Sequence, residues 1–186
     1  MNLSYYNDFV NIFLKSISIF VVQTRSMETV IRKGRKEDMP AVLELIKELA
    51  AFENEPDAVI TTVETLEKEG FDDNPLFHVF VAEVDGQIEG MALVYYRFST
   101  WKGRTLHLED LIVREEKRGT GLGNALYKKV IEYAREQGLK RVEWVVLDWN
   151  QHAIDFYERS GANVLRDWYT VQMDEDGITK FVETRA

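Results

Sequence analysis

The sequence contains no cysteine, only three prolines and three histidines, and no apolar run long enough to cross a membrane. Without cysteine the chain can form no disulfide, use no thiolate as nucleophile and build no cysteine-based zinc site. The histidines (His78, His107 and His152) lie far apart and lack the spacing of metal ligands. We therefore expect no metal and interpret the histidines as structural.

Basic residues are also few: 23 lysines and arginines face 32 acidic residues, which gives a formal net charge of −9. Such a surface repels the phosphates of nucleic acids and anionic lipid headgroups, so we expect neither nucleic acid nor membrane as a partner. The same charge attracts amines, while a local basic patch can still hold a phosphorylated cofactor. The 186 residues, 45% of them hydrophobic, suffice for one globular domain.

The first 26 residues are apolar only in patches, which Asp8, Asn11 and Lys15 interrupt. This stretch is too short and polar to span a bilayer, and it lacks the basic start and apolar centre of a secretory signal. We expect residues 1–26 to be an extension outside the fold and residues 27–186 to form a single domain. We also expect the protein in the cytoplasm.

Hydrophobic periodicity predicts a mixed α/β domain. Alternating or continuous apolar runs predict strands at Val30 to Arg32, Phe77 to Val84, Ile88 to Phe98, Thr105 to Val113, Arg141 to Leu147, Trp168 to Met173 and Ile178 to Val182. Helical spacing predicts helices at Met39 to Phe52, Thr62 to Glu69, Leu122 to Gln137 and Ala153 to Arg159. Glycines at positions 70 and 138 would end two of these helices, and the turn at Asp176-Gly177 would join the last two strands.

Gly119, Gly121 and Gly123 lie close together between a predicted strand and a predicted helix. The N–H groups and positive dipole at a helix N-terminus bind phosphate, and Arg118 adds positive charge. The glycine spacing matches neither the G-x-G-x-x-G fingerprint of dinucleotide-binding proteins nor the Walker A loop of nucleotide-binding proteins, so the sequence disfavours both kinds of nucleotide site. The alternative is a solvated loop in which the glycines only turn the chain.

The segment Arg118-Gly119-Thr120-Gly121-Leu122-Gly123 resembles the R/Q-x-x-G-x-G/A pyrophosphate loop of the GNAT acyl-CoA N-acetyltransferase superfamily. Further segments carry the resemblance to the diamine acetyltransferase and thialysine Nε-acetyltransferase branch: "VIR" at 30–32, "LIKELAAFE" at 45–53, "EGF" at 69–71, "LEDLIV" at 108–113, "VLDWNQ" at 146–151 and "FYERSGA" at 156–162. The segment "STWKGRT" at 99–105 is closer to the thialysine enzyme, since Ser99-Thr100 replaces an acidic residue of the spermidine/spermine type.

This resemblance implies the GNAT fold, a mostly antiparallel sheet flanked by helices, with acetyl-CoA as donor and a homodimer as the assembly. The implied cofactor contacts are the backbone of Leu111, Ile112 and Val113, the loop residues Arg118, Gly119, Thr120, Gly121, Leu122, Gly123 and Asn124, and Asn150 in the cleft.

The reaction would require a base, because an amine with a pKa of about 10.4 is only about one part in 2,500 neutral at pH 7. Glu109 and Asp110 are adjacent carboxylates within a predicted strand, where acidic residues are usually rare. Strict alternation along the strand would put their side chains on opposite faces of the sheet. The resemblance implies Glu109 as the amine-facing base, directly or through water, and leaves Asp110 structural. Both are otherwise explained as surface charges.

The resemblance further implies that Tyr157 donates a proton to the CoA sulfur and that Glu53 contacts the distal ammonium of the substrate. Without it, Tyr157 is an ordinary aromatic and Glu53 a solvated helix-end residue. The sequence thus predicts acetyl transfer to the primary amine of a small molecule, a thialysine-like amine or a short diamine, by direct attack. The alternatives are a protein lysine or N-terminal acetyltransferase and a non-catalytic module that senses acyl-CoA or an amine.

Overall fold

The computed structural model describes residues 28–184, which form two compact units that divide between Val142 and Glu143. The predicted N-terminal extension, residues 1–26, lies outside the described residues. Within residues 28–184, no helix combines the length and apolar character that crossing a membrane requires.

The first unit is built on an antiparallel sheet whose strands follow the order of the chain. The five-stranded sheet has the order β1-β2-β3-β4-β5, and the β1–β2, β2–β3 and β3–β4 pairs are antiparallel. Its elements are β1 (Thr29–Lys33), η1 (Lys36–Asp38), α2 (Met39–Phe52), α3 (Val63–Phe71), β2 (His78–Val84), β3 (Gln87–Ser99), β4 (Gly103–Val113), η2 (Glu115–Lys117) and α4 (Leu122–Glu136). The short β5 (Val142–Glu143) spans the division between the two units. The predicted fold class, a mixed α/β domain with a mostly antiparallel sheet, is confirmed.

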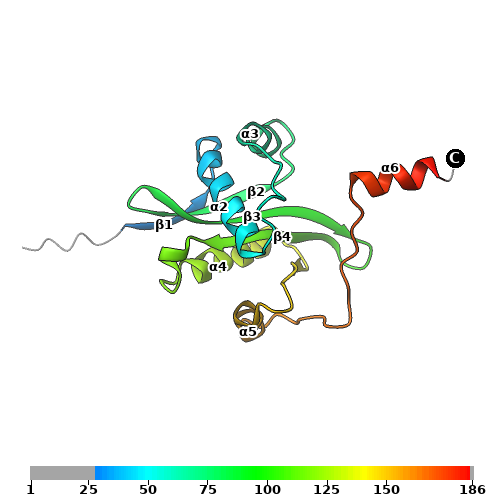
Figure 1. Cartoon of the computed structure of the whole chain (residues 1–186). Helices are drawn as coiled ribbons and strands as arrows, with labels where there is room; N and C mark the ends of the chain where they lie inside the picture. The colour runs from blue at the N-terminus through cyan, green and yellow to red at the C-terminus, as the bar shows by residue number, and fades with distance from the viewer. Residues whose placement is uncertain (1–27, 185–186) are drawn as a thin grey trace, which may run out of the picture. The chain divides into compact units, whose positions relative to one another are not determined.

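Helices cover both faces of this sheet, with α2 and α3 above it and α4 below it in Figure 1. On α2, the buried residues Met39, Val42 and Leu45 recur at helical spacing and pack in one core cluster with Val79 and Val81 of β2. The alternate residues of β2 face α4, where the Phe80 ring lies 5.3 Å from that of Tyr133. A hydrogen bond of 2.6 Å between the hydroxyls of Tyr96 and Tyr133 also links β3 to α4.

The ends of two helices follow from their sequence. The Thr62 side chain caps α3 by accepting from the Thr65 N–H at 3.2 Å, and Gly138 follows α4 with a left-handed φ of 65°. The prediction that Gly70 ends α3 is wrong, because the helix continues to Phe71. A Cβ at position 70 would lie 2.7 Å from the Phe77 ring, so close packing explains this glycine.

The second unit contains α5 (Gln151–Arg159) and α6 (Glu175–Glu183), and three strand predictions fail there. Arg141 to Leu147 is a strand only at β5, and Trp168 to Met173 is irregular, with Tyr169 and Val171 each 90% exposed. The predicted strand Ile178 to Val182 lies in α6, because its apolar residues also fit a helical spacing. Asp174 caps α6 by accepting from the Gly177 N–H at 2.7 Å, where we predicted a turn.

Candidate active site

The β4 strand carries two adjacent carboxylates at a bulge. Leu93 of β3 pairs with Asp110 and Val94 pairs with Leu108, so Glu109 is an extra residue without a partner in β3. The prediction that Glu109 and Asp110 lie on opposite faces depended on strict alternation, which a bulge interrupts. Bulges often redirect side chains at functional sites. The Glu109 side chain is 51% exposed.

Asp110 has the most perturbed carboxyl of this strand. Burial, together with the nearby negative charges of Glu109 and Glu53, raises the pKa of Asp110 to about 6. No hydrogen bond to this carboxyl is found among residues 28–184. Sequence reasoning treated Asp110 as structural, although the acidic pair within an apolar strand was the signal that marks it.

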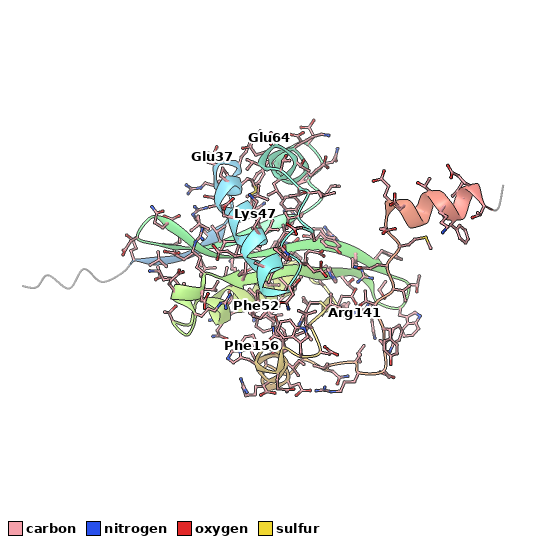
Figure 2. All side chains as sticks on the ribbon, in the orientation of Figure 1. Glu37, Lys47, Phe52, Glu64, Arg141 and Phe156 are labelled. Atoms are coloured by element: carbon pink, nitrogen blue, oxygen red, sulfur yellow. The ribbon has the colours of Figure 1, made fainter. Side chains whose placement is uncertain are left out.

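Glu53 caps the C-terminal end of α2 and brings a third carboxylate to this region. Loss of solvent around the Glu53 carboxyl raises its pKa. Figure 2 labels its neighbour Phe52 where α2 ends, and the Arg118 guanidinium lies 5.4 Å from the centre of the Phe52 ring. The end of α2 therefore brings Glu53 near Asp110 and Phe52 near the predicted phosphate loop.

Ion pairs hold the segment between β4 and α4 against its surroundings. Arg114 pairs with Glu48 of α2 and, at 3.5 Å, with Glu89 of β3. Lys117 also approaches Glu89, at 3.7 Å. These ion pairs connect α2 and β3 to the segment that leads into the glycine loop.

The loop itself presents free backbone donors at the start of α4. Gly119 and Gly121 have left-handed φ angles of 76° and 92°, which glycine adopts readily. The Ala125 N–H bonds the Gly121 oxygen, so Leu122, Gly123 and Asn124 precede the first intrahelical hydrogen bond. Within the described residues, no backbone acceptor is found for the amides of these three residues.

Gly123 is explained neither by its backbone conformation nor by packing. Its φ is not left-handed, and an added Cβ would meet only Val113 Cγ2, at an ordinary 3.8 Å. Glycine inside a helix costs about 1 kcal/mol relative to alanine. The close approach of a ligand to the backbone would explain this glycine, and free N–H groups at a helix start fit an anionic group such as a pyrophosphate.

The remaining predicted residues of β4 and its loop have identified structural contacts. Ile112 and Leu111 pair with Met91 and Ala92 of β3, and the Val113 oxygen accepts from Arg118 Nε at 3.2 Å. The Thr120 hydroxyl donates to the Lys117 oxygen at 2.6 Å, which stabilises the loop. The structure thus brings together Glu53, Glu109 and the residues from Leu111 to Asn124 in one unit.

Two predicted site residues belong to the second unit. The Asn150 side chain caps α5 by accepting from the Ala153 N–H at 3.2 Å. Tyr157 is half-buried on α5, and its ring packs edge-to-face on Trp144, with the ring centres 4.9 Å apart. Cofactor contact for Asn150 and proton donation by Tyr157 stay predictions.

Sequence reasoning missed the contact between His107 and Glu109. His107 Nε2 lies 3.4 Å from Glu109 Oε2, and the histidine is 9% exposed. The signal was the spacing of two residues along β4, which places side chains near each other in a strand. No cluster of three or more potential metal ligands is found among residues 28–184.

Comparison with known proteins gives the family of the chain. Residues 39–162 match the acetyltransferase (GNAT) family. The chain is 41% identical over 145 residues to the thialysine N-epsilon-acetyltransferase of Caenorhabditis elegans, covering 76% of this chain and 89% of the relative. It is 37% identical to the enzyme of that name from Mus musculus, covering 81% and 95%.

Solved structures share the fold at low sequence identity. An integron cassette protein from the mobile metagenome of V. cholerae aligns with a TM-score of 0.70 at 22% identity, covering 84% of this chain and 99% of that one. An aminoglycoside N-acetyltransferase solved in complex with CoA aligns with a TM-score of 0.64 at 16% identity, covering 80% and 97%. The chain therefore belongs to the GNAT family and is an acetyl-CoA-dependent N-acetyltransferase.

Proposed function

We propose that the enzyme transfers the acetyl group of acetyl-CoA to the primary amine of a small molecule, such as thialysine, a lysine-like amine or a short diamine. The observation that carries this proposal is the placement of three carboxylates and a helix start with free N–H groups in one unit. Glu53, Glu109 and Asp110 favour a cationic acceptor, and the electrostatic coupling of Asp110 to the other two supports their proximity. The thialysine acetyltransferases at 36–41% identity support the acceptor class.

The donor would be held by the start of α4 and the end of β4. The free amides from Leu122 to Asn124 and the cationic Arg118 suit its pyrophosphate, with Gly119, Thr120 and Gly121 shaping the loop. The backbone of Leu111, Ile112 and Val113 and the side chain of Asn150 would line the rest of the donor site. Acetyl-CoA supplies an activated thioester, and no cysteine is present to form an acetyl-enzyme.

Glu109 would take a proton from the ammonium, directly or through one water, so that the neutral amine attacks the carbonyl carbon. At pH 7 this removal costs about 4.6 kcal/mol, at 1.36 kcal/mol per pH unit. Glu53 would hold a distal ammonium. When the C–N bond forms and the C–S bond breaks, Tyr157, a phenol with a pKa of about 10, would donate its hydroxyl proton to the negative charge that develops on the leaving sulfur. The second proton of the attacking nitrogen would then restore the phenol.

The proposal includes a homodimer in the cytoplasm. Exposed apolar side chains of the second unit, among them Tyr169, Val171 and Trp168, favour a covering partner, since monomers rarely expose large apolar patches.

The test is CoA release from acetyl-CoA, with thialysine, lysine, putrescine, spermidine and a lysine-containing peptide offered in parallel. We expect turnover of thialysine or a short diamine and a fall of about 10²-fold in Tyr157→Phe. Tyr169→Phe removes a hydroxyl from an exposed tyrosine of the same unit and is the matched control. Turnover of the peptide alone would indicate a protein acceptor, and acetyl-CoA binding without any turnover would indicate a sensing module.

A further inference from the structure

His107 is a buried imidazole beside the proposed base. It lies on β4, two residues before Glu109, and its Nε2 is 3.4 Å from Glu109 Oε2. Its ring also packs on Tyr95 of β3, with the ring centres 5.0 Å apart. The imidazole is therefore held on the protein side of a carboxylate whose other side is open to solvent.

Arg97 of β3 determines which nitrogen of His107 carries the proton. Arg97 Nη1 lies 3.4 Å from His107 Nδ1, and a guanidinium can only donate hydrogen bonds. Nδ1 must then be the acceptor, which places the single proton of the neutral ring on Nε2. That proton faces Glu109.

We propose that His107 is a positioning residue for Glu109, with its Nε2–H donating to one carboxylate oxygen and leaving the other for the acceptor amine. This inference rests on the proposed role of Glu109 as base. Because Glu109 lies at a bulge and is half exposed, its side chain otherwise has considerable rotational freedom. His107 moves no proton in this arrangement. It keeps the carboxylate in the orientation that removes the proton from the ammonium.

The test is a double-mutant cycle that combines His107→Phe and His107→Gln with Glu109→Gln, with the CoA-release assay as readout. Phenylalanine retains a flat ring without a donor, whereas the glutamine amide can restore a donor near the position of Nε2. We expect His107→Phe to lower kcat about tenfold, with KM for acetyl-CoA unchanged, because a hydrogen bond to a charged group is lost. His107→Gln should recover most of kcat, and His107→Phe should cause no further fall when Glu109 is already glutamine.

Several outcomes would overturn the inference. An equal effect of His107→Phe with and without Glu109, or no recovery by glutamine, would assign the histidine a purely structural role. If Glu109→Gln were fully active, the proposed base itself would be wrong. If His107→Phe does not fold, the ¹⁵N resonances of His107 in the wild-type protein decide the question. A protonated Nε2 with an unprotonated Nδ1 supports the inference, and the opposite tautomer refutes it.

Discussion

Replacing Asp110 with asparagine should make the protein more stable at neutral pH. The partly buried Asp110 carboxyl has no hydrogen bond within the described residues and lies near two other carboxylates, and its pKa is raised from 3.8 to about 6. Its ionisation at neutral pH therefore opposes folding. Asparagine keeps the shape of the side chain and removes the charge, so it should also remove this opposition.

The sign and size of the effect follow from proton linkage. Between pH 3.8 and about 6 the folded protein binds more protons at Asp110 than the unfolded chain does, so the free energy of unfolding falls as pH rises. The unfavourable contribution is about 1 kcal/mol at pH 4.5 and about 3 kcal/mol at pH 7.5, at 1.36 kcal/mol per pH unit. The stability advantage of Asp110→Asn should thus grow by about 2 kcal/mol over this interval.

Urea unfolding of both proteins, followed by tryptophan fluorescence from pH 4.5 to pH 7.5, measures this difference. The wild type serves as the reference at each pH, so titrations shared by the two proteins cancel. If the two stability curves run parallel, the electrostatic reasoning about Asp110 is refuted. Because the variant also removes negative charge near the proposed ammonium site, KM for the amine should rise while KM for acetyl-CoA stays constant.

Two glycine substitutions should have contrasting effects. Gly123→Ala should stabilise the fold by about 0.5–1 kcal/mol because alanine favours a helix, yet it should weaken acetyl-CoA binding measured by calorimetry. Unchanged affinity would remove the ligand explanation for this glycine. Gly90→Ala should destabilise the fold by about 1–3 kcal/mol in urea unfolding. The new Cβ at position 90 would lie 2.8 Å from the Ile112 oxygen and 3.2 Å from Leu126 Cδ1. Near-wild-type stability would show that the backbone of β4 can move aside at little cost.

Sequence patterns predicted the first unit well because its elements have one strong local signal each. The helix predicted at Met39 to Phe52 coincides with α2, where apolar residues recur on one face and Glu53 follows as the C-cap. The three strands of the meander are also correct to within two residues at each end. Each strand has an apolar run bounded by turn residues. Each also pairs with the strand that is next to it in the chain, so its position in the sheet does not depend on a distant segment.

The C-terminal segment was predicted poorly because its local signals are ambiguous. Ile178, Phe181 and Val182 fit both a short strand and a helical face, and the cap supplied by Asp174 decides for the helix. The bulge at Glu109 was also beyond sequence reasoning, since it depends on the register between β3 and β4. The partial burial of Asp110 beside the exposed Glu109 follows from that register.

The proposed steps of the reaction separate along the chain, which makes them distinguishable in kinetics. In this proposal, amine recognition and deprotonation would depend on residues of the first unit, and donor binding would depend on the glycine loop of that unit together with Asn150 of the second unit. Protonation of the leaving sulfur depends on Tyr157, whose ring contacts include Trp144 of its own unit. Loss of the tyrosine hydroxyl should therefore lower kcat without changing acetyl-CoA affinity, whereas Gly123→Ala should lower that affinity. A Tyr157→Phe variant that bound the donor weakly would place the tyrosine in binding, and the proton for the sulfur would then have to come from another group.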